Sequence, residues 1–375
     1  MINLVTKECN GCSTCFNICP KNAISMNKNS EGFLYPNIDY SKCIGCKLCV
    51  NKCPLNIKNK QQIYKTFYGW NKDNNIRKNG SSGGVFFALS EYVFKNNGVV
   101  FGATYDYESN EAKHIMIESI DDMNKIGKSK YIQSSIGQVY KEVKIQIEMN
   151  KLVLFCGTPC QVNGLCSFLG TKPDNLLLVD FVCHGVPSPL VWKYHLKNIL
   201  KNDLSCESID FRNKDNGTIN FSLLIQNKSK KYKKGHNYDL FFKLFLSDTI
   251  LRESCYSCKA KGKNRTADIT ISDFWGAENY GVSKKECNKG VSLFSVYNDK
   301  ILNILHSSNN IYMREINNTV MENKPSFANS ATFNKDREPF FNGLTENNYN
   351  SKGKKVTKFF ITRKVINKIK RLIKK

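Results

Sequence analysis

The chain has 375 residues, 16 of them cysteine, and a formal net charge of +24. This length accommodates one large α/β domain plus a small module, and eight cysteines lie in the first 53 residues, unlike the spread of a secreted disulfide framework. No apolar segment approaches the roughly 18 residues of a spanning helix and no signal segment follows Met1, so we expect a cytoplasmic protein whose cysteines bind metal or do redox work.

The first predicted module, residues 1–58, contains two similar cysteine motifs at residues 9–20 and 43–54. Each has the spacing C-x2-C-x2-C-x3-C-P of bacterial ferredoxins, in which the fourth cysteine of each motif binds the other 4Fe–4S cluster. Zinc would not require this doubled eight-cysteine pattern. The predicted ligand sets are Cys9, Cys12, Cys15 and Cys53 for one cluster, and Cys43, Cys46, Cys49 and Cys19 for the other.

Residues 59–65 are polar and predict a linker, after which strand and helix patterns alternate to about residue 323. This alternation predicts an α/β domain with a mainly parallel sheet. The predicted strands are 98–105, 151–156, 176–182, 219–226 and 268–272. The predicted helices are 82–95, 135–150, 159–169, 190–200, 238–246 and 300–306. Residues 324–350 are polar and look irregular.

A second set of cysteines falls within this domain. Cys160 and Cys183 each follow a predicted buried strand, so in a parallel sheet both would emerge at the carboxyl edge, where ligands bind. Cys255 and Cys258 form a C-x2-C pair. Together the four thiolates are enough for a third 4Fe–4S cluster. The alternative is that some are small core residues and that the C-x2-C pair binds zinc or nothing.

A Gly/Ser loop at residues 79–84 opens the first predicted helix of the domain. Backbone amides at a helix start bind phosphate well, and glycines allow the backbone to approach a ligand closely. An ordinary flexible N-cap would have the same sequence. No G-x-G-x-x-G motif follows a strand, so no nicotinamide fingerprint is present.

The positive charge is concentrated at the end of the chain. Residues 352–375 contain eleven Lys and Arg and no acidic residue, and no recognition motif accompanies them, so we expect no nucleic-acid partner. Apolar residues recur at helical spacing from residue 356 to 375. This predicts a basic amphipathic helix that contacts the inner membrane face or a partner peripherally, or else stays solvated.

Five motifs occur in a fixed order: SSGGVF at 81–86, GKSKYIQS at 127–134, GTPCQV at 157–162, CHGVPSP at 183–189 and ADITISDFWG at 267–276. On these motifs the chain resembles the coenzyme F-420 hydrogenase/dehydrogenase beta-subunit family, with a 2×(4Fe–4S) ferredoxin domain fused in front. The resemblance divides the domain into an N-terminal part, 66–145, and a C-terminal part, 146–323, before a polar segment and tail, 324–375.

The resemblance implies a flavoprotein domain that binds FAD beside an iron–sulfur cluster. Carried over by motif, Cys160, Cys183, Cys255 and Cys258 would bind this proximal cluster. Ser82, Gly83 and Gly84 would approach the flavin, and its site would be lined by Lys128, Ser129, Lys130, Tyr131 and Gln133. His184 would transfer a proton beside the flavin as a catalytic residue, or would only position its turn.

The function expected from the resemblance is an oxidoreductase that passes electrons from the clusters to FAD. The flavin would then reduce a small or sugar-linked substrate or a redox partner protein, and some family members use coenzyme F-420. Members with a fused ferredoxin module resemble proteins encoded near polysaccharide-assembly genes, which suggests a role in exopolysaccharide biosynthesis. The alternative is a non-catalytic electron-transfer subunit that feeds a partner enzyme.

Overall fold

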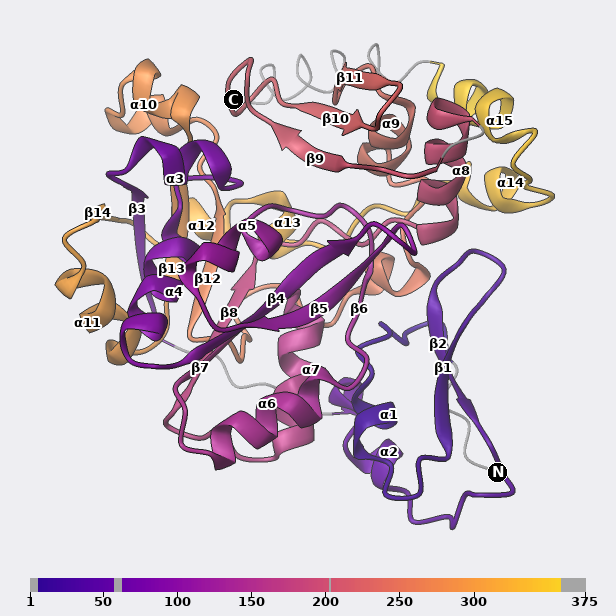
Figure 1. The fold of residues 1–375 in the computed structure, drawn as a ribbon, viewed down its shortest axis with the longest axis horizontal. Coiled ribbons are helices and arrows are strands. Elements are labelled where there is room, and N and C mark those ends of the chain that lie inside the picture. The colour runs from indigo at the N-terminus through magenta and orange to yellow at the C-terminus, as the bar shows by residue number, and fades with distance from the viewer. Residues whose placement is uncertain (1–5, 57–62, 202–203, 359–375) are drawn as a thin grey trace.

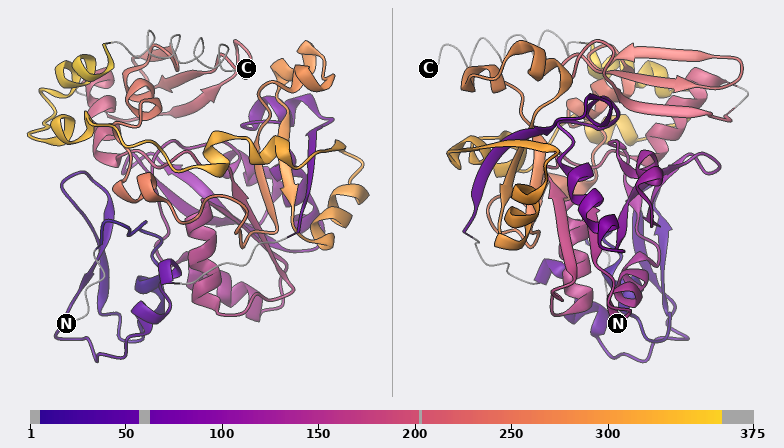
Figure 2. Two further views of the ribbon diagram at one scale, coloured as in Figure 1. Left: turned by 180° about the vertical axis from the view of Figure 1, so that it is seen from behind. Right: turned by 60° about the vertical axis from the view of Figure 1, so that its left-hand side comes forward.

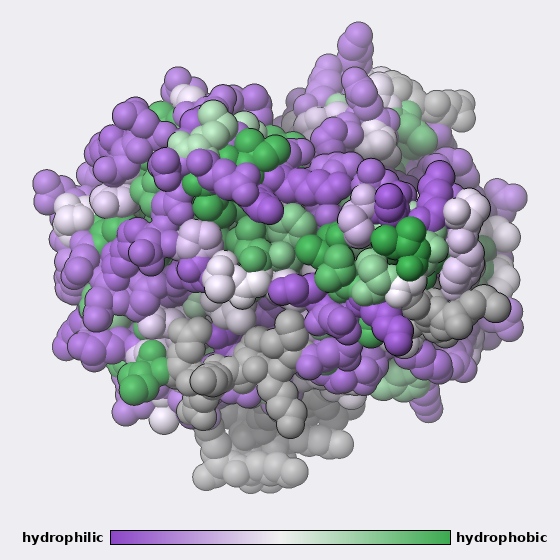
Figure 3. All heavy atoms as spheres, turned by 90° about the horizontal axis from the view of Figure 1, so that it is seen from below, coloured by the Kyte–Doolittle hydropathy of each residue, from purple (hydrophilic) through white to green (hydrophobic). Residues whose placement is uncertain are grey.

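The computed structural model describes residues 6–56, 63–201 and 204–358. In these ranges a small N-terminal module stands beside a nine-stranded sheet, and a three-stranded sheet covers the opposite end (Figure 1). The N-terminal module packs near α6 (Val139–Glu148) and α7 (Pro159–Leu169), and both further views show it on that side (Figure 2). Seen from below, the surface is mostly hydrophilic, with apolar side chains gathered in a central band (Figure 3).

The N-terminal module contains one hairpin and short helices that follow the cysteine loops. Its elements are α1 (Thr14–Ile18), β1 (Ile24–Lys28), β2 (Leu34–Ile38), α2 (Leu48–Asn51) and η1 (Pro54–Asn56). The two cysteine loops have the same backbone path, because Gly11 and Ser13 have φ values of 68° and 64° and the equivalent Gly45 and Lys47 have 69° and 58°. Glycine adopts this left-handed conformation without the penalty that a side chain imposes.

The large sheet has the order β14-β3-β13-β12-β8-β7-β4-β5-β6. Its central strands β4 (Val99–Asp106), β7 (Val153–Gly157), β8 (Leu176–Phe181) and β12 (Ile269–Asp273) pair in parallel. The flanking strands are β3 (Lys65–Asn71), β5 (Glu111–Ile117), β6 (Ser134–Ser135), β13 (Ser292–Val296) and β14 (Ile311–Ile316). Among the pairings that these flanking strands form, only that of β5 with β6 is parallel.

The prediction of a mainly parallel sheet was therefore wrong for the flanks, and the sheet is mixed. The four residues between β4 and β5 are too few for a crossover, so these strands pair as an antiparallel hairpin. The predicted parallel core is present, because β4, β7 and β8 are connected through the helices α6 and α7.

Helices cover both faces of this sheet because its central strands are apolar on both sides. Leu154 of β7 faces α4 (Val85–Lys95) and α11 (Asp299–Ser307), whereas its neighbours Val153 and Phe155 face α6 and α7. Short helical segments complete the domain: α3 (Asn74–Asn79), η2 (Ile120–Asp122), α5 (Met123–Ile126), η3 (Glu253–Ser257), η4 (Ala277–Tyr280), α10 (Lys284–Lys289) and α12 (Thr319–Glu322).

The three-stranded sheet is formed by β9 (Ser208–Asn213), β10 (Ser222–Gln226) and β11 (Lys231–Gly235). It shares a core with α8 (Pro189–Leu200) and α9 (Leu240–Leu246) around Trp192. The segment 324–350, predicted to be irregular, instead contains α13 (Pro325–Ala328) and α14 (Arg337–Phe341) and begins α15 (Tyr349–Thr357). Tyr349 is fully buried and its hydroxyl lies 3.0 Å from His195 Nδ1.

The predicted amphipathic tail falls almost entirely beyond residue 358 and so lies outside the described residues. Among the helices of the described part of the chain, none combines the length and apolar character needed to cross a bilayer.

Candidate functional site

A cavity of about 1080 Å³ lies at the carboxyl ends of β7, β8 and β12. Its walls come from the Gly/Ser loop before α4, the segment 126–134, the loop after β8 and the segment around η3. This is the edge where open α/β sheets bind ligands. Small-molecule pockets occupy about 300–1,000 Å³, so the cavity has room for an extended ligand.

The eight N-terminal cysteines form two groups in the structure. The thiols of Cys12 and Cys15 both lie in the electrostatic field of Cys9 and Cys53, so these four are neighbours although they come from both motifs. The other four line one small cavity near the surface: Cys19, Cys43, Cys46 and Cys49. The crosswise grouping that the spacing predicts is therefore the grouping that the fold brings together.

The thiols of Cys9, Cys12, Cys15 and Cys53 have the surroundings of a cation-binding site. Desolvation, together with the neighbouring Cys9 and Cys53, raises the pKa of Cys12 to about 11. Iron binds cysteine as thiolate, and four close thiolates repel one another unless a cationic core compensates them. This group of four thiols, of which Cys12 is buried and the others are half-buried, thus fits a 4Fe–4S cluster.

The later cysteines also converge. Cys160, Cys183, Cys255 and Cys258 all line the large cavity. Desolvation raises the pKa of Cys160 well above its usual value, and the other three thiols each raise it further. Parallel pairing of β7 and β8 brings Cys160 and Cys183 to one edge. The amide of Val186 donates to Cys255 Sγ at 3.4 Å, a contact of the kind that surrounds cluster sulfurs.

Cys156 lines the same cavity but does not belong to this group. The charges that act on its thiol are those of Asp180 and Lys130, and desolvation raises its pKa to about 12. It lies at the end of β7, one turn before Cys160.

The Gly/Ser loop contributes less to the cavity than its sequence suggests. Ser82 and Gly84 line the cavity, but Gly83 does not. The Gly83 amide donates to Ser292 Oγ at 2.9 Å, and a Cβ on Gly83 would lie 2.6 Å from the Gly69 carbonyl oxygen. Gly83 therefore allows the start of α4 to pack against β3 and β13, and its amide is already used.

The predicted residues from Lys128 to Gln133 all line the cavity. Lys128 Nζ pairs with Asp210 Oδ2 at 2.7 Å, and the Ser129 amide donates to Ser81 Oγ at 2.7 Å. Tyr131 packs among aromatic rings of the small sheet and α9, with Phe242 at a centroid distance of 5.3 Å.

Two of these residues have environments that the sequence did not reveal. Desolvation lowers the pKa of Lys130 to about 7. Gln133 turns toward the N-terminal module, because its Nε2 donates to the Asn10 carbonyl at 3.3 Å and its Oε1 accepts from Arg252 at 3.0 Å.

Sequence reasoning missed two basic residues near the cavity, Arg212 of β9 and Lys214 directly after it. Arg212 lines the cavity, pairs with Asp273 and lies 4.9 Å from the Phe221 ring centroid. Lys214 donates to the Ser82 carbonyl at 3.1 Å and so holds the Gly/Ser loop. Both lie between the predicted elements 190–200 and 219–226 and belong to no motif, so no sequence signal marked them. Arg212 thus joins Lys128 and Lys130 at this wall, where Asp210 and Asp273 pair with Lys128 and Arg212.

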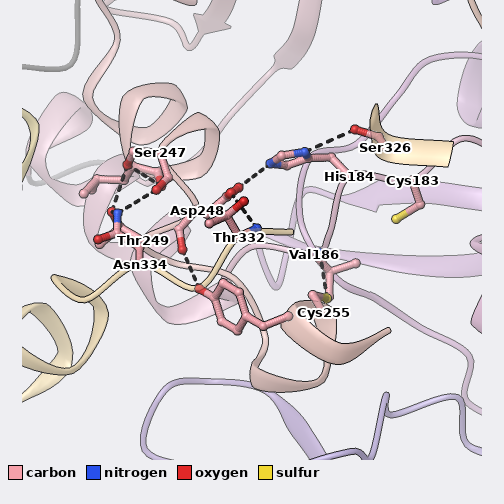
Figure 4. A network of polar contacts seen from close by, with 12 residues as sticks. Cys183, His184, Val186, Ser247, Asp248, Thr249, Cys255, Ser326, Thr332 and Asn334 are labelled. Atoms are coloured by element: carbon pink, nitrogen blue, oxygen red, sulfur yellow. Dashed lines mark hydrogen bonds and ion pairs between the residues drawn. The ribbon is translucent and has the colours of Figure 1, made fainter. Parts of the chain in front are cut away.

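His184 lies at the cavity wall and forms a pair with Asp248 (Figure 4). The distance from His184 Nε2 to Asp248 Oδ1 is 2.5 Å, and Nδ1 lies 3.4 Å from Ser326 Oγ. Asp248 Oδ2 also accepts from the Thr332 amide at 3.1 Å. The pair therefore orients the imidazole and at the same time connects the loop after β8 with residues 326–332.

Comparisons with known proteins match three separate regions of the chain. Residues 66–141 and 150–319 match the models described as coenzyme F420 hydrogenase/dehydrogenase beta subunit, N-terminal part and C terminus. Residues 8–57 match the 4Fe–4S dicluster domain, so the chain carries an iron–sulfur electron-transfer module.

Two relatives have similar chains. A coenzyme F420-dependent sulfite reductase of Methanocaldococcus jannaschii is 26% identical over 170 residues, which is 42% of this chain and 24% of the relative. The chain thus spans about a quarter of the length of that relative. A chain of the F420-reducing [NiFe] hydrogenase complex of Methanosarcina barkeri is 14% identical, with a TM-score of 0.48 over 80% of this chain and 92% of that one.

Proposed function

The chain belongs to the coenzyme F420 hydrogenase/dehydrogenase beta-subunit family, and we propose that it is an iron–sulfur flavoprotein oxidoreductase. In this proposal electrons pass from the dicluster domain through a third cluster to FAD in the large cavity, and then to an acceptor. The observation that carries it is the convergence of Cys160, Cys183, Cys255 and Cys258 at the wall of that cavity.

The order of the clusters follows from their surroundings. Cys46 is exposed, so the group of Cys19, Cys43, Cys46 and Cys49 is the outer one, where electrons enter. The group of Cys9, Cys12, Cys15 and Cys53 is the inner one, because Thr14 beside it donates to the Gly164 carbonyl of α7 at 3.0 Å. This supports a route in which electrons pass from the outer cysteine group to the inner group and then to the third group.

The cavity residues fit FAD. Lys128, Lys130 and Arg212 provide cationic contacts for its phosphates, and the ring of Tyr131 provides an apolar surface. Bound FAD would supply the conversion between one-electron and two-electron transfer that clusters lack. His184, oriented by Asp248, is our candidate for proton transfer, with Ser326 at its Nδ1. Positioning of the turn remains the competing role for His184.

We propose a small anionic molecule as the acceptor, because the same cationic wall would recognise it. Coenzyme F420, which the descriptions of the relatives name, and a sugar-linked intermediate of exopolysaccharide assembly both have this chemistry. The second candidate function is a non-catalytic subunit that hands electrons to a partner protein, which the family description as a beta subunit favours.

The test is a count of iron, sulfide and flavin in protein purified without oxygen. We expect about twelve iron atoms per chain, since each 4Fe–4S cluster holds about four. We also expect one flavin per chain, which absorbs at about 450 nm. About eight iron atoms would refute the third cluster, and absence of flavin would refute the oxidoreductase in favour of the electron-transfer subunit.

Ligand variants sharpen this count. Cys258→Ser and Cys183→Ser should each lower the iron content from about twelve to about eight. Cys156→Ser is the matched control, because Cys156 lines the same cavity outside the group and its loss should leave the iron content unchanged.

A further inference from the structure

Arg252 lies at the boundary between the N-terminal module and η3, and it is fully buried. Its Nε donates to the Cys9 carbonyl at 2.8 Å, its Nη1 to Gln133 Oε1 at 3.0 Å and its Nη2 to the Leu34 carbonyl at 3.0 Å. The guanidinium also lies 4.1 Å from the ring centroid of Tyr35. All three hydrogen-bond acceptors are neutral.

Within the part of the chain that the structure describes, Arg252 forms no ion pair. The carboxylates of this region are used elsewhere, since Glu253 pairs with Lys7 at 3.2 Å, Glu8 pairs with Lys259 at 2.8 Å and Glu31 pairs with Arg337. Arginine stays protonated in proteins, and an isolated buried charge is strongly unfavourable unless a counter-charge accompanies it. A negative partner for Arg252 must therefore come from another group.

Arg252 lies between two different cysteine groups. Arg252 Nη2 lies 3.9 Å from Cys9 Sγ of the inner group. On the other side, Cys255 of the third group follows three residues later, and its amide donates to the Arg252 carbonyl at 2.9 Å. Arg252 and Cys255 also line the same large cavity.

We propose that Arg252 is a positioning residue for electron transfer between the inner cluster and the third cluster. The negative charge of the two clusters compensates the charge of Arg252, and Arg252 in turn raises the reduction potentials of both clusters. This inference rests on the proposed function, because it requires the third cluster. A cluster with four thiolate ligands becomes more negative when it gains an electron, and a nearby cation stabilises that reduced form. With both clusters bound, one electron would leave the inner cluster and enter the third, and no bond would form or break.

The experiment is a redox titration of the whole chain, with each cluster followed by electron paramagnetic resonance. In Arg252→Gln we expect both the inner and third clusters to become at least tenfold harder to reduce, about 59 mV more negative for one electron. Arg252→Lys keeps the positive charge, so the reduction potentials of the inner and third clusters should stay close to the wild-type values. The outer cluster serves as an internal reference whose potential should not move.

A double variant separates charge from structural support. Arg337 is also buried and connects the same module to the large domain, with Nη1 2.9 Å from Glu31 Oε1, but its charge is neutralised. The pair Arg337→Gln with Glu31→Gln removes this connection without changing the net charge. We expect a lower unfolding temperature and unchanged potentials.

A second route tests the charge if Arg252→Gln fails to fold. Gln133→Glu is nearly isosteric and places a carboxylate against Arg252 Nη1, so it should make both clusters harder to reduce. Unchanged potentials in Arg252→Gln or in Gln133→Glu, with all iron retained, would overturn the inference. A wild-type iron content of about eight would instead overturn the proposed function, before any potential is measured.

Discussion

Lys130 is held at the cavity wall, where desolvation lowers its pKa to about 7 and its Nζ donates to the Lys125 carbonyl at 2.9 Å. The charges that face it are Lys128, which lowers its pKa, and Asp210 and the Cys156 thiol, which raise it. Its side chain is therefore charged below about pH 7 and neutral above, unlike an ordinary lysine, which stays charged to about pH 10.

This pKa predicts that flavin retention depends on pH. A bound phosphate favours the protonated lysine, so affinity should fall as pH rises through about 7, by about tenfold for each unit by which binding raises the pKa. The measurement is the fraction of flavin that the purified chain keeps after equilibration at several pH values. Lys130→Met should bind weakly at all of them. A Lys130→Met profile as steep as that of wild type would contradict this role.

At the residue scale, what could be predicted depends on whether the partners are close in sequence. The chemistry of the cysteine motifs could be predicted from the sequence, because three ligands of each cluster come from one short loop. Asp248 and Arg252 carry no such signal, since their partners His184 and Cys9 lie 64 and 243 residues away. Gly83 resembled a phosphate-binding glycine, but tertiary packing against Gly69 determines its role.

At the scale of elements, α7 joins the two modules through Gly164. A Cβ on Gly164 would lie 2.7 Å from Tyr140 Oη, 2.9 Å from Thr14 Oγ1 and 3.0 Å from Cys12 Cβ. Gly164→Ala should therefore push α1 away from α7 and cost about 1–3 kcal/mol, as overpacked sites do. The measurement is the thermal unfolding midpoint at a fixed scan rate, together with the iron content.

Gly353→Ala in α15 is the matched control. There the new Cβ would meet only the Leu240 side chain, at 3.1 Å, which can rotate away, while the helix gains the better propensity of alanine. We expect a much smaller change in midpoint than for Gly164→Ala. An equal decrease of the unfolding midpoint in the two variants would show that α7 does not depend on the close approach of α1 at Gly164.

The central elements were predictable because their apolar runs are long and continuous. The strands β4, β7, β8, β10 and β12 and the helices α4, α6, α7, α8, α9 and α11 all overlap their predicted ranges. The edge strand β14 was missed because its exposed and buried residues do not alternate regularly. The helix α15 was missed because its helical pattern is short and polar, and the burial of Tyr349 against His195 stabilises it.

For the whole molecule, the proposed route has electrons enter at the outer cysteine group. Ile44 and Tyr40 near this group are 61% and 54% exposed, which suits a contact surface. Lys21 and Lys47 are exposed and line the small cavity of this group, and no carboxylate does. An apolar surface with a basic rim favours an acidic one-electron carrier protein, because opposite charges steer the encounter.

This arrangement predicts a salt-dependent reaction. The double variant Lys21→Glu with Lys47→Glu should lower the second-order rate of reduction by an acidic ferredoxin about tenfold or more at low salt, and the difference should shrink as salt screens the charges. Rapid mixing at several ionic strengths measures this rate. Lys284→Glu with Lys285→Glu makes the same charge change on exposed residues of α10, on the other side of the molecule from the cysteine module (Figure 1). Equal slowing in both double variants would mean that net charge alone acts, and that the carrier does not dock at the outer group.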